Sequence, residues 1–334
     1  MKRFGFLIGA AMAASVSIAS AGAQPAPPAG APGISPDLIR RIGAIEAAAK
    51  LLPDTPGTGA YPAVKAEDTS LPDHTIYRPD KLAEVRGKLP IVVWGNGGCA
   101  ADGAGQRFHL LEIASHGYLV IANGGIKSGP GIAPAPPPPA PPVGPNGQFV
   151  PPPPKTSAGQ LTQAIDWAIA ENARPASPFY GKLDTARIAA SGWSCGGVQA
   201  LTVSTSDPRI TTTVIHNSGL FSGGPRMPGM ELEKAALAKL QAPIIYILGG
   251  PTDIAYVKGT DDYARIGQVP IAMANLDVGH GGSFFEPNGG KAAQVAVAWL
   301  NWRLKGDAAG AAWFAGADCT LCKSADWKYE HKGF

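Results

Sequence analysis

Short apolar runs alternate with segments of helical periodicity from about Tyr61 onward, and this alternation limits the fold more than any other feature of the sequence. Each run is bounded by glycine, proline or polar residues, as is typical of strands buried on both faces. Repeated strand–helix alternation predicts an α/β fold with a mostly parallel central sheet and helices on both of its faces. The predicted strands are residues 73–79, 89–94, 118–122, 187–190, 210–215, 244–248 and 271–276. The predicted helices are residues 36–52, 108–114, 156–172, a segment after Gly196, and 291–304.

One large domain accounts for most of the chain. With 334 residues, of which 45% are hydrophobic, the sequence can bury a substantial core. We assign residues 59–310 to this domain and residues 24–58 to an N-terminal leader that contains a short helix. Residues 311–334, which include Cys319 and Cys322, are expected to form a C-terminal tail.

The N-terminus has the features of a secretory signal peptide. Lys2 and Arg3 precede a short apolar stretch, and small residues ending at Ala23 offer a cleavage site. We expect residues 1–23 to be removed, which places the mature protein outside the cell or in the periplasm. The alternative is an anchoring helix or membrane span, but no stop-transfer charge cluster follows. No other stretch approaches the roughly 20 apolar residues that a span requires, so no integral membrane span is expected in the mature chain.

The charge balance argues against two classes of partner. The net charge is +3, and Lys2 and Arg3 lie in the segment that we expect to be removed. The mature chain is therefore nearly neutral and has no long basic run. Neither nucleic acid nor an anionic membrane surface is expected as a partner.

Residues 129–155 form a proline-rich insertion loop in which about half of the residues are proline. This composition favours an extended, polyproline-like loop over helix or sheet. One interpretation is a surface insertion between a strand and the next helix. The other is a recognition segment or a lid, because strand-to-helix loops of parallel sheets line the ligand crevice.

A Gly-x-Ser-x-Gly motif lies between a predicted strand and a predicted helix. Residues 192–197 read Gly-Trp-Ser-Cys-Gly-Gly. In this context the motif predicts a tight turn that presents the Ser194 hydroxyl above the sheet, at the N-terminus of a helix. Gly192 and Gly196 avoid the clashes that side chains would cause in such a turn. Ser194 is therefore the candidate nucleophile.

A serine nucleophile needs a general base, and three histidines follow Ser194 in the chain. His331 lies in the predicted tail. His216 ends a predicted strand, where packing or a satisfied hydrogen bond is the usual role. His280 follows the last predicted strand and is flanked by glycines that suit a loop reaching over the sheet edge. We predict His280 as the base, and the alternative is a loop histidine without a catalytic role.

The base in turn needs an orienting carboxylate, expected a few residues past the strand at 244–248. Asp253 holds that position. Asp261, Asp262 and Asp277 are rivals, and any of these aspartates could instead be a solvated surface residue or a turn cap.

Two backbone N–H groups are needed to stabilise the tetrahedral intermediate of acyl transfer. One is predicted to come from Cys195, the residue after the nucleophile. The other is predicted to come from the glycine-rich loop 95–99 that follows a buried strand. Asn96 and Gly97 both remain candidates for this second donor.

These elements together resemble a known family. Residues 95–98, residues 192–197, Asp253 and His280 match the ordered elements of α/β-hydrolases, over roughly residues 60–310. The chain looks most similar to the compact secreted branch of cutinase-like polyester hydrolases, chlorophyllase-like esterases and dienelactone-hydrolase-like proteins. This resemblance implies two-step acyl transfer through an acyl-enzyme, with no metal and no organic cofactor.

The chain departs from these relatives at two positions. Dienelactone hydrolases have cysteine where this chain has Ser194, so their substrate is not carried over. Trp94 stands where many relatives have histidine, which leaves the second oxyanion donor open. The sequence around Ser194 also resembles prolyl-oligopeptidase-type peptidases, but 334 residues leave no room for their large propeller domain.

The four cysteines form two candidate pairs. In the α/β-hydrolase fold the loop with Cys99 faces the loop with Cys195, so the resemblance suggests a disulfide that would hold both oxyanion donors together. The alternative is two buried free thiols. Cys319 and Cys322 have the spacing of a redox motif without its strand-to-helix context, so a local structural disulfide is favoured. Without suitably spaced histidines they do not predict a zinc site.

The sequence thus predicts an exported serine hydrolase that cleaves carboxylic esters, small or polymeric, through a Ser194–His280–Asp253 triad. A secreted serine peptidase or amidase on the same fold is the second interpretation. The third is a non-catalytic binding protein on a hydrolase scaffold. Trp94 and Trp193 either flank the site, which would favour apolar or aromatic substrates, or belong to the core.

Overall fold

The computed structural model describes Met1 and residues 36–133, 152–223 and 229–334. The helices and strands in these ranges belong to one compact unit, Pro32–Phe334. The predicted signal peptide after Met1, the first part of the predicted leader and residues 134–151 of the proline-rich insertion lie outside the described residues. Within the described ranges, no helix is both long enough and apolar enough to cross a membrane.

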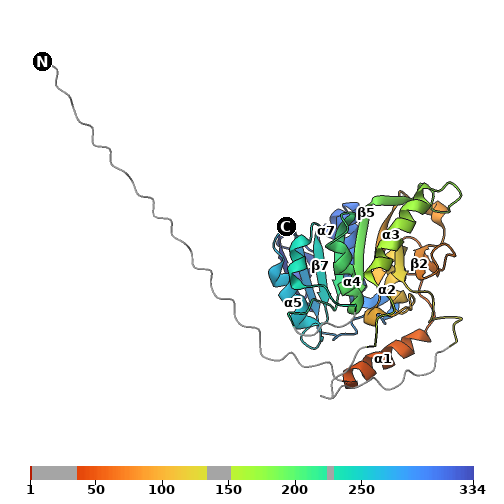
Figure 1. Cartoon of the computed structure of the whole chain (residues 1–334), viewed down its shortest axis with the longest axis horizontal. Coiled ribbons are helices and arrows are strands. Elements are labelled where there is room, and N and C mark those ends of the chain that lie inside the picture. The colour runs from red at the N-terminus through yellow and green to blue at the C-terminus, as the bar shows by residue number, and fades with distance from the viewer. Residues whose placement is uncertain (2–35, 134–151, 224–228) are drawn as a thin grey trace. The chain divides into compact units, whose positions relative to one another are not determined.

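A single mixed sheet forms the centre of the unit (Figure 1). In the described part of the chain it has nine strands, in the order β1-β2-β4-β3-β5-β6-β7-β8-β9. All pairs from β4 to β8 are parallel, whereas β1, β2 and β9 pair antiparallel with their neighbours. The prediction of a mostly parallel sheet is confirmed. The strands are β1 (Ala63–Ala66), β2 (His74–Pro79), β3 (Leu89–Gly95), β4 (Leu119–Asn123), β5 (Leu183–Trp193), β6 (Ile210–His216), β7 (Ile244–Leu248), β8 (Ile271–Leu276) and β9 (Trp327–Lys332).

Helices cover both faces of this sheet (Figure 1). Residues of α3, α4 and α5 share one apolar layer with Ile91 and Val93 of β3, and residues of α2 and α6 share the other with Val92 and Trp94. The alternation follows from the two-residue period of a strand. The helices are α1 (Pro36–Lys50), α2 (Arg107–Ser115), α3 (Ala158–Ala173), α4 (Cys195–Ser204), α5 (Tyr256–Arg265), α6 (Gly290–Lys305), α7 (Ala308–Ala311) and α8 (Thr320–Lys323), with short 3-10 turns η1 (Leu82–Glu84), η2 (Gly97–Cys99), η3 (Lys234–Lys239) and η4 (Pro287–Gly289).

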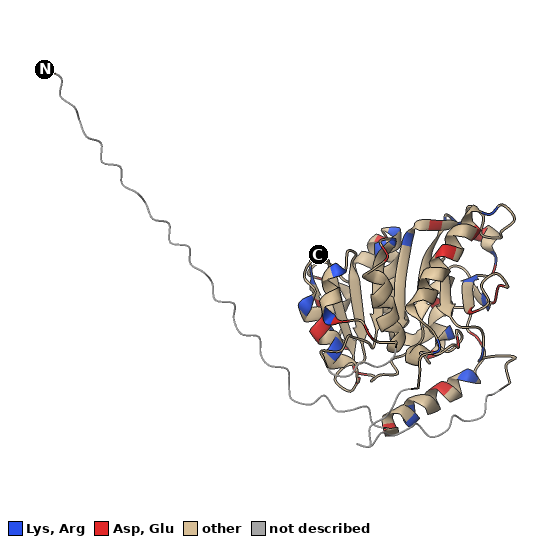
Figure 2. Cartoon of the chain, in the orientation of Figure 1, with Lys and Arg blue, Asp and Glu red and all other residues tan. Residues whose placement is uncertain are grey.

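The central strands carry almost no charge. No Lys, Arg, Asp or Glu occurs in β3, β4, β6, β7 or β8, and Figure 2 shows the charged residues on the surrounding helices and loops. Such strands can be covered on both faces without leaving buried charges unpaired. Because the strands from β4 to β8 are parallel, their carboxyl ends lie at the same edge of the sheet.

The predicted C-terminal tail, residues 311–334, contains the last strand of this sheet. Their strand β9 pairs antiparallel with β8 along its whole length. Only Trp327 of β9 is buried, whereas Lys328, Glu330 and His331 are exposed. An edge strand of this kind has no apolar run, so the sequence pattern did not predict it.

A buried arginine holds α1 against the domain. Arg107, the first residue of α2, donates from Nη2 to the carbonyl oxygens of Ala49 at 2.8 Å and Leu52 at 2.6 Å, and from Nε to Asp54 Oδ1 at 2.7 Å. The last carbonyls of a helix have no partner within the helix. The guanidinium supplies donors there and also complements the negative end of the helix dipole.

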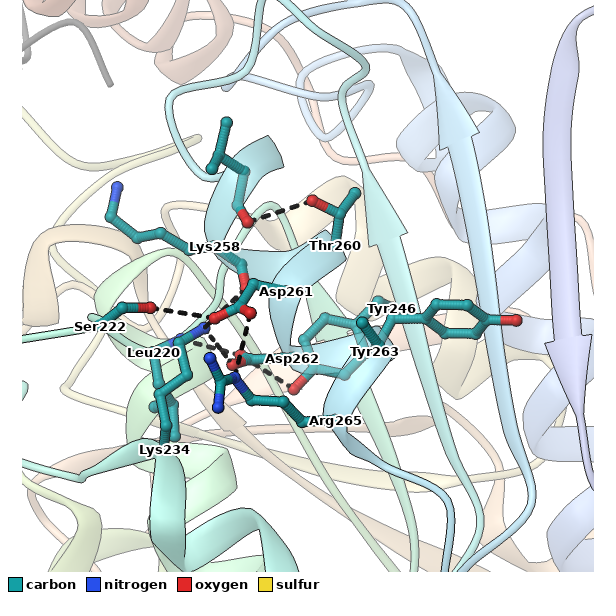
Figure 3. Close-up of polar contacts among 12 residues, drawn as sticks. Leu220, Ser222, Lys234, Tyr246, Lys258, Thr260, Asp261, Asp262, Tyr263 and Arg265 are labelled. Carbon is teal, nitrogen blue, oxygen red and sulfur yellow. Dashed lines mark hydrogen bonds and ion pairs between the residues drawn. The ribbon is translucent and has the colours of Figure 1, made fainter. Parts of the chain in front are cut away.

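A second buried ionic cluster ties α5 to the segment after β6 (Figure 3). The ammonium of Lys234 contacts Asp262 Oδ1 at 2.6 Å and Asp261 Oδ2 at 2.7 Å. The other oxygen of Asp262 accepts from the backbone N–H of Leu220 at 2.8 Å and from the hydroxyl of Tyr246 at 3.2 Å. Burial raises the pKa of Asp262 to about 6, although Lys234 and these hydrogen bonds act to lower it.

We predict that Lys234→Met lowers the free energy of unfolding by about 3–5 kcal/mol at pH 8, because it leaves a buried carboxylate without its counter-charge. At pH 5 the loss should be smaller, since a protonated Asp262 needs no cation. Urea unfolding at both pH values measures the effect. Lys239→Met, at the exposed end of the same turn, is the control. Equal losses at the two pH values would contradict the buried ion pair.

Candidate active site

Ser194 lies at the sharp turn between β5 and α4. Its backbone has φ 55° and ψ −120°, a conformation that non-glycine residues rarely adopt. A Cβ on Gly192 would lie 2.3 Å from the carbonyl oxygen of Gly196, and a Cβ on Gly196 would lie 2.0 Å from the carbonyl group of Gly95. The turn therefore needs glycine at these positions, and it brings the start of α4 against the end of β3.

A continuous chain of hydrogen bonds runs from Asp253 to Ser194. His280 Nδ1 lies 2.6 Å from Asp253 Oδ1, and His280 Nε2 lies 2.9 Å from Ser194 Oγ. An ionised carboxylate can only accept, so the imidazole proton lies on Nδ1 and Nε2 accepts from the serine hydroxyl. Asp253 and His280 are buried, and Ser194 is half-buried. The structure thus brings together the three side chains that the sequence singled out.

The Asp253 carboxylate is held in its ionised form. Burial alone would raise its pKa, but the hydrogen bond from His280 and those from the backbone N–H groups of Ala255 and Gly249 act in the opposite direction, and the pKa is lowered. These N–H groups donate to Asp253 at 2.8 and 3.1 Å. A fixed, ionised carboxylate is the partner that keeps an imidazole in one orientation and one tautomer.

The rival aspartates lie elsewhere. Asp261 and Asp262 contact Lys234, as described above. Asp277 accepts from the hydroxyl of Thr252 at 3.1 Å. None of the three has a hydrogen bond to His280 among the described contacts.

The glycine-rich loop after β3 lies beside the first turn of α4. A Cβ on Gly196 would lie 2.5 Å from the backbone nitrogen of Asn96, so this nitrogen is adjacent to the turn that contains Cys195. The side-chain amide of Asn96 donates to the carbonyl oxygens of Ala100 at 2.9 Å and Asn123 at 2.5 Å. Its own side chain therefore anchors the loop to the end of β4.

A disulfide joins this loop to α4. Cys99 and Cys195 are paired, with their Cα atoms 5.3 Å apart. The carbonyl oxygen of Cys99 also accepts from the backbone N–H groups of Lys155 and Thr156, at the C-terminal end of the proline-rich insertion. Cys319 and Cys322 form a second, local disulfide at the start of α8. Across the described ranges, no group of three or more His, Cys, Asp or Glu side chains is placed to hold a metal ion.

Two cavities lie outside the hydrogen-bonded triad. The smaller, about 60 Å³, lies between Glu46 and Lys50 of α1 and Asn96 and Gly97 of the glycine-rich loop after β3. The larger, about 560 Å³, is lined by residues of β1, by residues 54–56 and by residues 126–132. Ser194 lines neither of these two cavities.

The comparison with protein families decides the family. A family model described as PET hydrolase-like matches residues 148–324, which is more than half of the chain. The chain belongs to the PET hydrolase-like family. Its fold is accordingly the α/β-hydrolase fold, as the sequence motifs predicted, and the family is one of ester-hydrolysing enzymes. The matched part of this PET hydrolase-like chain includes Ser194, Asp253 and His280, whereas the loop 95–99 precedes it. The comparison with curated proteins gives no match.

An aromatic layer next to the turn at Ser194 was not predicted. The rings of His109 and His216 are 4.7 Å apart, and both lie next to Trp94 and Phe284. The backbone N–H of Ser194 donates to the carbonyl oxygen of His216 at 3.1 Å. The sequence signalled this layer only through the position of His216 at the end of a strand. His109 lies in α2, far from His216 in the chain, and no sequence pattern linked the two. Trp94 is fully buried and therefore belongs to the core.

Both histidines of this layer are neutral. None of their ring nitrogens has a hydrogen-bond partner among the described residues. Burial lowers the pKa of His109 to about 3, and burial together with the neighbouring His109 lowers the pKa of His216 well below its usual value. The unfolded chain instead takes up protons near pH 6.5. The stability contribution of these neutral rings is complete above that pH and is lost as the pH falls toward 3.

We predict that His109→Phe makes the protein less sensitive to acid. Phenylalanine keeps the ring contacts and does not titrate. Between pH 6.5 and pH 4, removal of one buried histidine should reduce the loss of stability by up to about 1.4 kcal/mol per pH unit. Urea unfolding at several pH values measures this slope, with His331→Phe on the exposed face of β9 as the control. Parallel slopes in wild type and His109→Phe would show that the buried histidines do not govern acid stability.

Proposed function

We propose that this chain is an exported serine esterase that cleaves carboxylic esters through an acyl-enzyme. The observation that carries the proposal is the hydrogen-bonded line from Asp253 through His280 to Ser194, with contacts of 2.6 and 2.9 Å. Membership in an ester-hydrolysing family supports the reaction class. The family description adds PET to the polymeric esters that are candidates for the substrate.

The proposed reaction has two halves. In the first, Ser194 Oγ attacks the acyl carbon while His280 Nε2 takes the hydroxyl proton and then gives it to the leaving alcohol. In the second, His280 takes a proton from water, the resulting hydroxide attacks the acyl-enzyme, and the acid product leaves as Ser194 regains its proton. Asp253 holds the imidazole and stabilises its protonated form. No step requires a cofactor.

The oxyanion is proposed to bind the backbone N–H of Cys195 and that of Asn96 or Gly97. Support comes from the position of Cys195 at the first turn of α4, where the helix dipole favours negative charge. A Cβ built on Gly196 would lie 2.5 Å from the backbone nitrogen of Asn96, and this closeness supports the loop after β3 as the source of the second donor. The Cys99–Cys195 disulfide would keep the two sides of this site at a constant distance.

Export is proposed on two grounds. Residues 1–23 have the charge and apolar pattern of a signal peptide. Both disulfides suit an oxidising compartment, because cytosolic thiols are kept reduced. A secreted or periplasmic location follows from the two together.

We predict that a fluorophosphonate probe forms one adduct, on Ser194. Intact mass and peptide mapping of the mature protein measure it. Ser194→Ala should abolish the adduct and lower ester turnover by at least about 10⁴-fold, because the nucleophile is lost. Ser206→Ala, at an exposed residue two positions after the end of α4, should leave both unchanged.

Substrate pairs distinguish the proposed esterase from a peptidase or amidase. Of an ester and an anilide that share the same acyl group, the ester should be cleaved faster. PET film as substrate tests whether polymeric esters are also cleaved. A preference for the anilide would reverse the assignment. If the folded wild type forms no adduct with the fluorophosphonate probe, the proposed catalytic triad is contradicted and the interpretation as a non-catalytic binding protein is favoured.

We predict that Cys99→Ala/Cys195→Ala lowers both stability and turnover. The two cysteines are 96 positions apart, so loss of the disulfide should lower the free energy of unfolding by about 4.7 kcal/mol in the chain-entropy treatment. A misplaced oxyanion donor should lower kcat by up to about 10²–10³-fold. Cys319→Ala/Cys322→Ala is the control, because its two cysteines are only 3 positions apart and neither belongs to α4 or to the loop after β3. Thermal unfolding and ester kinetics measure both, and an unchanged kcat in Cys99→Ala/Cys195→Ala would separate the disulfide from the oxyanion site.

A further inference from the structure

Trp193 contacts the base as well as preceding the nucleophile. Its indole Nε1–H donates to the backbone carbonyl oxygen of His280 at 2.9 Å. The two rings lie side by side, with centroids 5.7 Å apart. The indole also packs on Phe284 and Phe285, which follow His280 in the chain. One rigid side chain on β5 therefore holds the whole loop that carries the base.

The same indole contacts the proposed oxyanion loop, residues 95–99. A Cβ on Gly97 would lie 2.2 Å from Cε3 and 2.4 Å from Cζ3 of Trp193. Gly97 is not among the glycines with positive φ, so its backbone would accept alanine. The indole ring alone excludes a side chain at this position, which means that Gly97 rests directly on it.

The loop that carries His280 has little rigidity of its own. Gly279, directly before His280, and Gly282 have φ values of 74° and 55°, and Gly281 directly follows His280. Glycines lose more conformational freedom on ordering than other residues do. The indole N–H of Trp193, at the end of the buried strand β5, therefore restrains a loop that has few restraints of its own.

We propose that Trp193 is a positioning residue that sets the distances among Ser194, His280 and the oxyanion loop. The inference rests on the proposed esterase function. Trp193 is only 4% exposed, so its ring does not present a face to substrate. It acts through His280 and Gly97, and its removal changes the geometry of the reacting groups without removing any of them.

Trp193→Phe tests the hydrogen bond and the ring edge together. Phenylalanine lacks the indole N–H and the atoms that meet Gly97. We expect kcat for a small soluble ester to fall about 10- to 100-fold with little change in KM, because small displacements of reacting groups have effects of this size. The rate of fluorophosphonate labelling should fall in parallel.

Trp167→Phe is the matched control. Trp167 is also buried and also donates from its indole Nε1, to Ser70 Oγ at 2.8 Å, but it lies on α3 in the apolar layer on the other face. Trp167→Phe should lower the free energy of unfolding and leave kcat unchanged. Equal kcat in the two variants, or a raised KM with unchanged kcat in Trp193→Phe, would overturn the proposal.

A double-mutant cycle tests the contact with Gly97 and does not depend on the folding of one variant. Gly97→Ala should lower kcat strongly in wild type and by a much smaller factor in Trp193→Phe, where the colliding atoms are absent. Gly105→Ala, whose Cβ meets only ordinary contacts at 3.5 Å, is the control in the same region. If Trp193→Phe does not fold, Gly97→Ala against Gly105→Ala still decides, because equal activity of these two would overturn the contact.

The wild-type adduct is measured first, so that two kinds of failure are distinguished. A wild type without an adduct on Ser194 ends the proposed function. If the wild type is labelled and Gly97→Ala lowers kcat by the same factor in the wild type and in Trp193→Phe, only the positioning role of Trp193 is overturned.

Discussion

The contact between the backbone of Gly196 and the backbone of Gly95 is the constraint on which the rest of the site depends. A single methyl group at Gly196 would lie 2.0 Å from the carbonyl group of Gly95. Because both residues lack side chains, α4 can start directly against the end of β3. The backbone nitrogen of Asn96 then lies beside the first turn of α4, and Cys99 comes close enough to Cys195 to pair with it.

The loops around this contact are restrained from outside rather than by their own conformational preferences. Asn217, just after β6, donates from Nδ2 to the carbonyl oxygen of Gly279 at 2.9 Å, and Trp193 donates to the next carbonyl, that of His280. Asn96 fixes its own loop through its side chain. In each case the donor is anchored at the end of a buried strand. The proposed base and oxyanion donors thus take their positions from the most rigid part of the fold.

Buried polar groups surround the site at a cost in stability. His109 and His216 are neutral and without partners among the described residues, and the Asp262 carboxylate is buried beside Lys234. The backbone of His216 contacts Ser194, and the backbone of Leu220 contacts Asp262. Natural proteins depart from purely apolar packing mainly near functional sites, where geometry matters more than stability. The polar groups here lie directly next to the segments that hold the proposed triad.

Local patterns were sufficient for the fold class and for the sharp turn at Ser194, because strand period and a strand-turn-helix motif are visible within a few residues. They were insufficient for α5 and β9, whose side chains are mostly polar or exposed. The choice among Asp253, Asp261 and Asp262 depended on the pairing of β7 with β8, which brings residues 27 positions apart into hydrogen-bond contact. The proposed role of Trp193 rests on two loops that meet only in the folded sheet. The sequence by itself determined the α/β-hydrolase framework and the sharp turn at Ser194, because these follow from local backbone sterics and apolar periodicity. Only the tertiary structure decided which side chains meet at the sheet edge, because those contacts join segments that the chain order keeps apart.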